Sequence, residues 1–312
     1  MARRPKRPPP LSTRDGLGPA RVRMPPGRAE STVVAFLESV TGDPLGVARR
    51  LAEREVLLAD GSVVDRDTAY LPGGLVFLYR DMPDEIEVPG QIHILYRDDN
   101  IVVVDKPPFL ATMPRGSHVV QTAVVQLRRK YSLESIAPAH RLDRLTSGVL
   151  LLTLRPQVRR AYQELFASQQ VTKEYQAIAP LIDRPMPLRI ENRLERVRGD
   201  HCTRIVTGEP NAVTDIDVVG VRDGLAQYRL APSTGKTHQL RAHLAGQGAP
   251  IVGDPLYGTQ ARPDDDFSRP LQLLAHRLTF IDPINGKPRE FVAQRELMTL
   301  AQASAATSGL TT

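Results

Sequence analysis

Short apolar segments recur along the chain from residue 101 onward, and they are the feature that most limits its fold. Each segment ends at polar or turn-forming residues, which is typical of β-strands. The expected strands are Ile101–Val104, Val149–Leu154, Glu174–Ala179, Arg204–Thr207, Val213–Val219, Ala226–Leu230 and Leu278–Ile281. Many strands with few helices predict a large α+β domain rather than regularly repeated βαβ units.

Helical patterns are few among these strands. Apolar spacing predicts helices over Gln121–Lys130, Gln157–Ser168 and Thr237–Ala245. Thr237 is a plausible N-cap for the last of them, because its hydroxyl can accept a hydrogen bond from the first turn.

A smaller structured segment precedes this region. Thr32–Val40 and Leu45–Glu55 read as helices, and strands are expected at Val56–Leu58 and Ser62–Val64 on either side of an Asp60-Gly61 turn. Residues 31–90 are therefore expected to form a small α+β module.

Two classes of protein are excluded by composition. The longest apolar runs, such as Val149–Leu152, are far shorter than the roughly 20 residues of a membrane-spanning helix. Cys202 is the single cysteine, which excludes an intramolecular disulfide and a zinc site built on several thiolates. A soluble protein of a reducing cytoplasm is the expectation.

The N-terminal 30 residues form a basic, proline-rich segment. They contain eight basic and two acidic residues, a net charge of +6 that equals the formal charge of the whole chain. Seven prolines and few apolar residues predict a disordered, extended tail over residues 1–30, and there is no apolar core of a secretory signal. The C-terminal residues 301–312 are also expected to be flexible.

The remaining charge is unevenly distributed. Residues 31–90 carry five basic and eleven acidic side chains, a net −6, so residues 91–312 carry +6. Within Gln121–Arg160 there are eight basic and two acidic residues. Such a cluster suits a polyanion such as nucleic acid, although a solvated helix face would have the same composition.

Several common catalytic motifs are missing. Ser233–Thr237 resembles the end of a phosphate-binding loop, but Leu230 stands where that loop requires glycine. The sequence has no Gly-x-Ser-x-Gly element, no His-Glu-x-x-His element and no Cys/His pairs with zinc spacing. Hydrolase and metalloenzyme interpretations therefore lose their usual support.

The segment His140–Gly148 places Asp143 between two arginines, just before the expected strand Val149–Leu154. On spacing alone, such an aspartate is more typical of a surface ion pair than of a catalytic group. The nine residues read His-Arg-Leu-Asp-Arg-Leu-Thr-Ser-Gly, however. They resemble the His-Arg-Leu-Asp-x-x-Thr-Ser-Gly signature of the RluA-type pseudouridine synthases.

Further segments resemble the same family in the same order. Lys173–Ala177 is similar to its Lys-x-Tyr-x-Ala strand, Thr234–Leu244 to its Thr-Gly-Arg-Thr-His-Gln-Ile-Arg-x-His-Leu element, and Pro250–Gly258 to its Pro-Ile-x-Gly-Asp-x-x-Tyr-Gly loop. Shorter matches occur at Asp105–Pro107 and Ala275–Leu278, so that the resemblance spans residues 98 to about 292. Lys236 replaces an arginine of the pattern, and Ala242 replaces a larger aliphatic residue.

The resemblance implies a fold and a domain order. We expect a pseudouridine synthase catalytic domain with a large mixed or antiparallel sheet over residues 91–300. Residues 31–90 would form a module similar to the alpha-L RNA-binding domain, but a net charge of −6 is unsuited to binding phosphates.

The resemblance also implies a reaction. Uridine in RNA becomes pseudouridine when its glycosidic bond to ring nitrogen breaks and the uracil is rejoined through ring carbon 5, without redox change and hence without a cofactor. Asp143 would be the nucleophile or base, acting on the ribose or on the uracil ring. Arg241 would pair with Asp143 and favour its ionised form, and Tyr175 would lie flat against the base. A surface cation and a core tyrosine are the alternatives for these last two residues.

RNA contacts follow from the same resemblance. A uridine in folded RNA must leave its stack to be reached, and Arg141 is a candidate to fill the space it vacates. Lys173, Lys236 and His238 are expected to contact the RNA backbone or the wall of the site. Asp254 is interpreted as a turn residue.

The overall expectation is a cytoplasmic, monomeric enzyme acting on a uridine of ribosomal or transfer RNA, with no metal and no membrane partner. The competing class is a non-catalytic RNA-binding or ribosome-assembly protein with the same fold. The complete set of Asp143, Tyr175 and Arg241 favours the enzyme, because a protein that only binds RNA has no use for it.

Overall fold

The structure is a computed structural model that describes residues 9–82, 84–196, 201–258, 263 and 265–308. The chain divides into two compact units. The first extends to Asp84 and includes Val125–Glu134, and the second consists of Glu85–Val124 and the residues from Ser135 onward.

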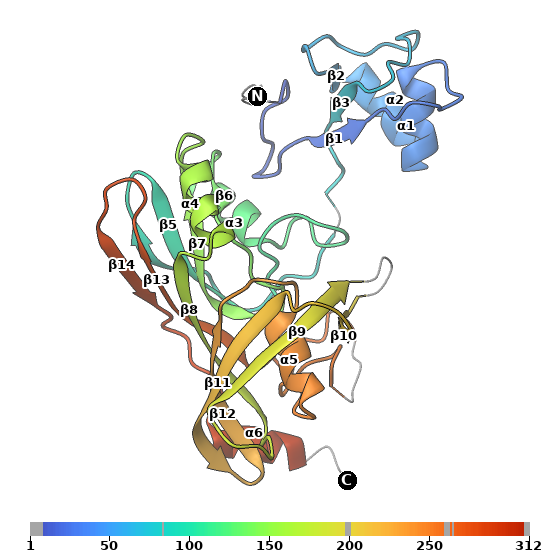
Figure 1. Cartoon of the computed structure of the whole chain (residues 1–312). Coiled ribbons are helices and arrows are strands. Elements are labelled where there is room, and N and C mark those ends of the chain that lie inside the picture. The colour runs from blue at the N-terminus through green and yellow to red at the C-terminus, as the bar shows by residue number, and fades with distance from the viewer. Residues whose placement is uncertain (1–8, 83, 197–200, 259–262, 264, 309–312) are drawn as a thin grey trace. The chain divides into compact units, whose positions relative to one another are not determined.

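The first unit is a small α+β module (Figure 1). Its elements are β1 (Ala20–Arg23), α1 (Val33–Thr41), α2 (Pro44–Ala52), β2 (Val56–Leu58) and β3 (Leu75–Leu78). The strands form an antiparallel sheet in the order β1-β3-β2. Helix α1 begins after Thr32, whose hydroxyl accepts a hydrogen bond from the Ala35 amide, as expected of an N-cap.

Strand β1 lies in the segment expected to be disordered, so that expectation is wrong for these residues. Ala20 and Met24 are buried, and they pack in one core with Val33, Phe36 and Val76. Apolar and basic residues alternate from Ala20 to Met24, and this period of two buries one side of the strand while Arg21 and Arg23 stay exposed. The high content of proline and arginine in the surrounding sequence hides this pattern. Residues 1–8 lie outside the described residues.

The second unit is built on a sheet of eleven strands, which confirms the expected α+β class. Its strands are β4 (His93–Arg97), β5 (Ile101–Lys106), β6 (Ala137–Pro138), β7 (Ser147–Thr153), β8 (Val171–Pro180), β9 (Leu188–Arg196), β10 (Thr203–Val206), β11 (Ala212–Arg222), β12 (Leu225–Pro232), β13 (Leu273–Ile281) and β14 (Pro288–Val292). Its helices are α4 (Arg159–Ala167), α5 (Gln239–Gly246) and α6 (Leu300–Ser308), while α3 (Ala123–Tyr131) begins in this unit and continues into the segment grouped with the first.

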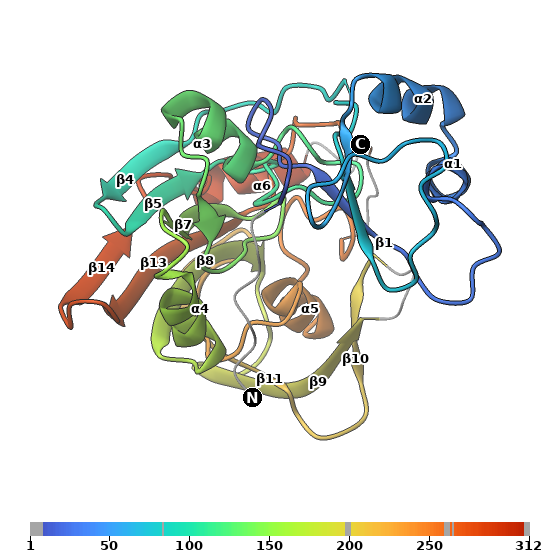
Figure 2. The same cartoon turned by 90° about the horizontal axis from the view of Figure 1, so that it is seen from above.

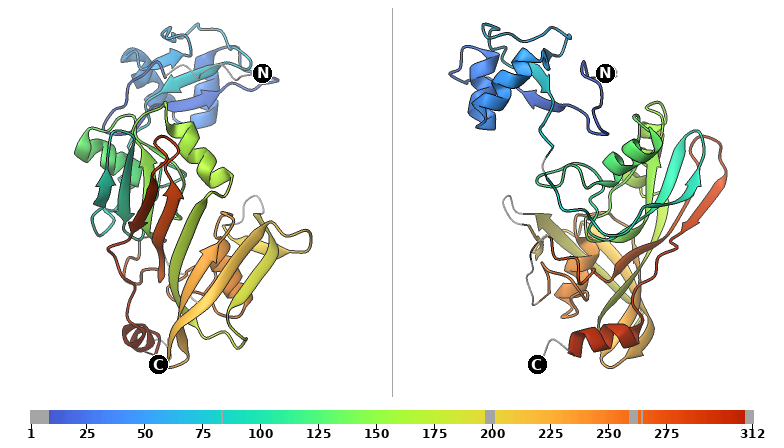
Figure 3. Two further views of the ribbon diagram at one scale, coloured as in Figure 1. Left: turned by 60° about the vertical axis from the view of Figure 1, so that its left-hand side comes forward. Right: turned by 180° about the vertical axis from the view of Figure 1, so that it is seen from behind.

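The main path of the sheet is β10-β9-β11-β12-β8-β13-β7-β5-β4, with β14 beside β13 and β6 beside β7. The pairings are antiparallel except for β13 with β7, so the sheet is mixed. Figure 3 shows β8 as the long strand that joins the two halves of this sheet. The central place of β8, between β12 and β13, puts its side chains close to the residues that enter β7.

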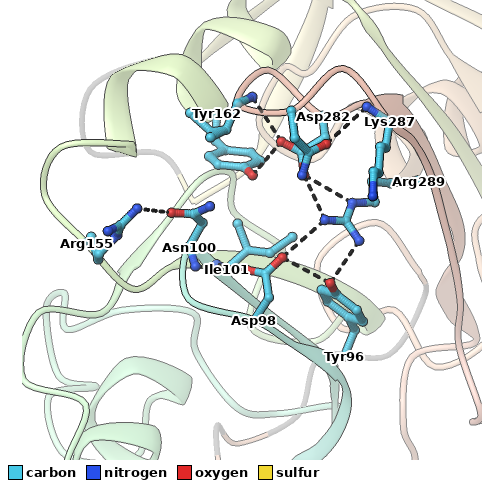
Figure 4. A network of polar contacts seen from close by, with 11 residues as sticks. Tyr96, Asp98, Asn100, Ile101, Arg155, Tyr162, Asp282, Lys287 and Arg289 are labelled. Carbon is cyan, nitrogen blue, oxygen red and sulfur yellow. Dashed lines mark hydrogen bonds and ion pairs between the residues drawn. The ribbon is translucent and has the colours of Figure 1, made fainter.

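Helix α4 covers one part of the sheet with its apolar side. Val158, Tyr162 and Leu165 recur at helical spacing and are buried in one cluster with β5, β7 and β13 residues such as Val103 and Phe280. A polar network also holds this helix (Figure 4). The Tyr162 hydroxyl donates to Asp282 at 2.9 Å.

The same network connects three strands of the sheet. The Arg289 guanidinium donates to Asp282 at 3.0 Å, to the Tyr96 hydroxyl at 2.8 Å and to Asp98 at 3.1 Å (Figure 4). Burial opposes ionisation of Asp282, but hydrogen bonds from the Ile284 amide, Tyr162 and Arg289 outweigh it and lower its pKa. A buried charge that is paired and hydrogen-bonded in this way fixes the position of α4 relative to the sheet.

Helix α5 lies against the other half of the sheet (Figure 2). Its His243 is buried, and the two ring nitrogens lie 3.0 Å from the Thr214 hydroxyl and 3.0 Å from the Asn192 side-chain oxygen. Burial lowers the pKa of His243 to about 4, so the ring is neutral at pH 7. The residue at the N-cap position of α5 is His238 rather than the expected Thr237, because the left-handed backbone conformation of His238 delays the first helical residue to Gln239.

The C-terminal end is more ordered than expected. Helix α6 occupies Leu300–Ser308, where the sequence predicted a flexible segment. Ala303 is fully buried and packs with Ile178 and Leu225, which provides the apolar contact that holds the helix. Residues 309–312 lie outside the described residues. Within the described ranges, no helix is both long and apolar enough to cross a membrane.

Candidate active site

A pocket of about 680 Å³ opens in the second unit. All seven site residues expected from the sequence line it, namely Arg141, Asp143, Lys173, Tyr175, Lys236, His238 and Arg241. They come from three separate segments of the chain: the loop before β7, strand β8, and the loop that leads into α5 together with the first turn of this helix. The fold therefore brings together the residues that the sequence singled out.

Asp143 lies in the loop between β6 and β7. The Thr146 amide donates to the Asp143 carbonyl at 3.1 Å, which closes a tight turn. Five residues after Asp143, Gly148 has a φ of +106°, and a Cβ atom there would lie 2.2 Å from the Ala275 carbonyl oxygen. Only glycine fits this backbone, so β7 can pair directly with β13 and hold the Asp143 loop at the edge of the pocket.

Tyr175 lies near the middle of β8, where it pairs with Leu230 of β12 and Ala275 of β13. Burial raises the pKa of the Tyr175 hydroxyl, and the nearby charge of Asp143 raises it further. The phenol therefore stays protonated at neutral pH. What the residue offers to the pocket is a flat, uncharged aromatic ring beside Asp143.

Arg241 is in the first turn of α5, and its guanidinium is buried. Its Nε and Nη2 atoms donate to the two carboxylate oxygens of Asp254 at 2.7 and 2.6 Å. The expected ion pair with Asp143 is therefore wrong in this structure, because Asp254 occupies the paired edge of the guanidinium. Burial lowers the pKa of Arg241, but Asp254 outweighs it, and Asp143 contributes in the same direction. Asp143 therefore interacts electrostatically with this cation but does not form an ion pair with it.

The Asp143 side chain is half-buried. Within the described ranges it forms no ion pair and accepts no side-chain hydrogen bond. A carboxylate that lines the same pocket as the cation Arg241 and has no such partner is available to a substrate.

Asp254 does more than form the expected turn. One carboxylate oxygen accepts hydrogen bonds from the Leu256 and Tyr257 amides at 2.9 and 3.1 Å, which does define a turn. Both oxygens also bind Arg241. Burial opposes its ionisation, but Arg241 outweighs burial and keeps the pKa of Asp254 below its ordinary value.

The loop before α5 is fixed by buried hydrogen bonds. Lys173 donates to the Thr234 carbonyl at 2.7 Å, and burial lowers the pKa of its ammonium to about 8. The Gln239 side-chain oxygen accepts hydrogen bonds from the Lys236 amide and from the Thr234 hydroxyl. These contacts hold Lys236 at an exposed position of the pocket wall.

The protonation state of His238 follows from its neighbours. The single proton of the Tyr257 hydroxyl goes to the Thr203 carbonyl at 3.0 Å, and the Thr203 amide donates to the same hydroxyl at 2.6 Å. His238 Nδ1 lies 3.3 Å from this hydroxyl, which connects the ring to Tyr257. Burial lowers the pKa of His238, although Asp143 opposes it, so the ring is neutral at pH 7.

Helix α4 supplies pocket residues that the sequence did not single out. Arg159, Gln163 and Phe166 recur at helical spacing and line the pocket. Phe166 stacks on His140, with ring centroids 4.4 Å apart. The Leu151 amide donates to His140 Nε2 at 3.1 Å, and burial lowers the pKa of His140 to about 3. His140 is therefore a neutral, structural part of the wall, and only the 3.6-residue period of α4 could have indicated its partners.

Two contacts to the loop backbone were also missed. Lys106 is fully buried and donates to the carbonyls of Pro107, Leu110 and Arg144. Burial lowers the pKa of its ammonium to about 7. The Thr112 hydroxyl donates a hydrogen bond to the Leu142 carbonyl and accepts one from the Leu142 amide. Asp105–Pro107 matched the family pattern, but nothing in the sequence connected this segment with Asp143.

Comparisons with known proteins agree with this geometry. Residues 100–246 match the family model described as RNA pseudouridylate synthase. The dual-specificity RNA pseudouridine synthase RluA of Haemophilus influenzae is 32% identical over 66% of this chain and 94% of its own length. RluA of Escherichia coli is 34% identical over 64% of this chain and 91% of its own length.

Relatives outside bacteria and solved structures give the same result. The mitochondrial tRNA pseudouridine(32) synthase of Saccharomyces cerevisiae is 29% identical, over 67% of this chain and 46% of its own. The structure of human RNA pseudouridylate synthase domain containing 1 is 26% identical, with a TM-score of 0.53, over 71% of this chain and 97% of that one. The chain belongs to the RluA-type family of RNA pseudouridine synthases. It is an isomerase that converts uridine in RNA into pseudouridine.

Proposed function

We propose that this enzyme modifies a specific uridine in ribosomal or transfer RNA, with Asp143, Tyr175 and Arg241 as its catalytic residues. The observation that carries the proposal is that these three side chains, from three distant segments, line one pocket. The yeast relative is named for a transfer RNA position, and two bacterial relatives are named as dual-specificity enzymes.

Asp143 is the nucleophile or base in this proposal. The reaction breaks the bond between ribose C1′ and uracil N1, forms a bond from C1′ to C5, releases the C5 proton and returns a proton to N1. Asp143 acts as a carboxylate in either form of this reaction, and the buried cation Arg241 lines the same pocket. Tyr175 supports the detached uracil with its ring, since an aromatic face holds a base flat without fixing its rotation in the plane.

The remaining expected residues contact the RNA. Arg141 is exposed at the pocket and fills the space left by the flipped uridine. Lys236 is exposed and suited to a phosphate, while Lys173 and the ring of His238 form part of the pocket wall. No cofactor takes part.

The domain and cellular assignments are also proposals. Residues 31–90 together with strand β1 would form the alpha-L-like module, and residues 91–300 together with helix α6 the catalytic domain. A monomer would suffice, because all three catalytic side chains come from one chain. The reducing cytoplasm suits a chain with one cysteine.

The test measures loss of the C5 proton. RNA labelled with [5-³H]uridine is prepared from cells that lack the gene, and tritium release is followed with the full-length protein. The wild type is expected to release tritium. Asp143→Asn is expected to abolish release while RNA affinity, measured by filter binding, stays within about twofold. The matched control is Asp217→Asn, at an exposed ion pair with Arg229, and it should retain full activity.

The competing class makes a different prediction. A non-catalytic RNA-binding protein would bind the same RNA but release no tritium even as the wild type. Full activity of Asp143→Asn would instead overturn the catalytic assignment. Mapping pseudouridine in cellular RNA with and without the gene then identifies the target position.

A further inference from the structure

Thr112 exchanges two hydrogen bonds with the backbone of Leu142, the residue before Asp143. The Thr112 hydroxyl donates to the Leu142 carbonyl at 2.8 Å and accepts a hydrogen bond from the Leu142 amide at 3.2 Å. Thr112 and Leu142 are both buried, with 4% and 5% of their surfaces exposed. A buried residue whose backbone amide and carbonyl are both bound by one side chain has little freedom to shift, because the peptide groups on both sides of its Cα are held.

The Thr112 backbone is itself fixed. The Ala123 amide donates to the Ala111 carbonyl at 2.8 Å, and the Val124 amide donates to the Thr112 carbonyl at 3.2 Å. These are amides of the first turn of α3, which have no acceptors within their own helix. The hydroxyl of Thr112 is therefore presented to Leu142 from a rigid support.

A second contact holds the residue after Asp143. Lys106 donates to the Arg144 carbonyl at 3.2 Å, and two more of its hydrogen bonds go to the Pro107 and Leu110 carbonyls. The segment from Lys106 to Thr112 therefore binds the backbone on both sides of Asp143. The carboxylate projects from a peptide that is held at its preceding and its following residue.

We propose that Thr112 is a positioning residue that sets the placement of the Asp143 carboxylate through Leu142. This inference rests on the proposed catalytic role of Asp143. Thr112 does not touch substrate in this scheme. Because a catalytic group that is displaced by about 1 Å can lose on the order of 100-fold in rate, the contact is expected to affect the chemical step rather than RNA binding.

The test compares two substitutions of similar shape. Thr112→Val removes the hydroxyl, and Thr112→Ser keeps it. In single-turnover tritium release from [5-³H]uridine-labelled RNA, Thr112→Val should be slower by about 10- to 100-fold, with half-saturation by RNA unchanged within about twofold. Thr112→Ser should restore the rate to within about threefold of the wild type.

Thr153→Val is the matched control. Thr153 is a fully buried threonine of β7 whose hydroxyl donates to the Ala137 carbonyl at 3.1 Å. The Thr153→Val variant should lower the melting temperature about as much as Thr112→Val does, but it should leave the single-turnover rate unchanged. An equal loss of melting temperature in both variants without a rate difference would overturn the proposal.

Hydrogen exchange provides a readout that is independent of activity. Measured by mass spectrometry, the peptide that contains Leu142–Thr146 should exchange faster in Thr112→Val than in the wild type or in Thr153→Val. Unchanged exchange would overturn the proposal. If exchange is faster but the wild type releases no tritium, the proposed function fails and the contact stands.

Thr112→Ala covers the case in which the valine variant does not fold. The smaller side chain leaves room for water to satisfy the Leu142 amide and carbonyl. Water is not attached to the segment that carries Thr112, so the rate loss should persist in this variant. A wild-type rate in Thr112→Ala would contradict a positioning role.

Discussion

The guanidinium of Arg241 and the carboxylate of Asp254 form a two-point ion pair, with N–O distances of 2.7 and 2.6 Å and both groups buried. Two parallel hydrogen bonds fix the plane of the guanidinium as well as its position. Asp143 contributes to the raised pKa of Arg241, so the same cation also interacts electrostatically with the Asp143 carboxylate in the pocket. Asp254 thereby determines where this positive charge lies relative to Asp143.

Asp254→Asn should therefore damage both stability and catalysis. Removing one partner of a buried ion pair leaves the other charge uncompensated and costs about 3–5 kcal/mol. We expect the free energy of unfolding in urea to fall by that order and single-turnover tritium release to slow by at least about tenfold, since the Arg241 guanidinium is no longer fixed.

The control for this prediction is an exposed ion pair between strands β9 and β11. Arg189 and Asp215 lie 3.0 Å apart with about half of each side chain accessible, at 55% and 47%. Asp215→Asn should change the free energy of unfolding by less than about 1 kcal/mol and leave the rate unaltered. If Asp254→Asn and Asp215→Asn lost similar amounts of unfolding free energy and of rate, the specific role of Asp254 in fixing Arg241 would be refuted.

The pairing of Arg241 could not be read from the sequence. His140–Gly148 and Lys173–Ala177 are contiguous motifs that can be recognised from the sequence alone, and the fold places their Asp143 and Tyr175 in one pocket. The partner of Arg241 depends instead on how the loop after α5 folds back onto the helix. Asp143 and Asp254 both lie in segments that resemble the family, and only tertiary packing decides which of them pairs with Arg241.

The prediction of a disordered N-terminal segment was wrong for Ala20–Arg23 because it rested on composition. Proline and arginine dominate residues 1–30, yet the alternation from Ala20 to Met24 forms β1. The strand is stable because β3 provides its hydrogen bonds and the apolar side finds a core. A central strand of the large sheet was easier to predict, since Ile101–Val104 of β5 are all buried and form a continuous apolar run.

Substitutions at Tyr175 separate the aromatic ring from the hydroxyl. Because burial and Asp143 both raise the pKa of this phenol, it does not ionise in the neutral range and its ring is the expected contribution. Tyr175→Leu should slow single-turnover tritium release more than Tyr175→Phe does, by about tenfold or more, since base stacking contributes about 1–3 kcal/mol.

Tyr228 offers a control for loss of a buried tyrosine. It lies on β12, is fully buried, and donates to the Pro180 carbonyl at 2.7 Å. Tyr228→Phe should lower stability without changing the rate. If leucine and phenylalanine at position 175 gave equal rates, the role of the ring as a support for the base would be refuted.

The stability of the enzyme should fall in mild acid because the fold holds two histidines, His140 and His243, in neutral form. Burial lowers the pKa of His243 to about 4 and that of His140 to about 3, from an ordinary value of 6.5. Below pH 6.5 the unfolded chain binds protons that the folded chain does not, so unfolding becomes easier as pH falls towards 4. Above pH 6.5 both states carry neutral rings, and this contribution no longer changes with pH.

Urea unfolding at intervals from pH 7 to pH 4 measures this effect. His243→Gln should reduce the slope of the free energy of unfolding by up to about 1.4 kcal/mol per pH unit, the value for one proton. The control is His93→Gln at an exposed position of β4, which should keep the wild-type profile. A wild-type slope in His243→Gln would mean that this ring is already charged in the folded protein.

The basic N-terminal residues should contribute to RNA affinity through their charge. Because Ala20–Arg23 forms β1, a deletion up to residue 30 would remove a strand, and the change must end before it. Replacing the four cations Arg3, Arg4, Lys6 and Arg7 by glutamine keeps the chain length. Each lost phosphate contact lowers the slope of log affinity against log salt by about 0.7 for single-stranded RNA, so the four together lower it by at most about 3.

Filter binding of RNA from cells that lack the gene, between about 50 and 200 mM salt, gives this slope. Replacing Pro8, Pro9 and Pro10 by alanine is the control, because it changes the same part of the chain without changing charge. We expect the control to keep the wild-type slope and the glutamine variant to lose part of it. Equal slopes in all three proteins would assign the salt dependence to the cations around the pocket, such as Arg141 and Lys236, and would exclude a contact between the N-terminal residues and RNA.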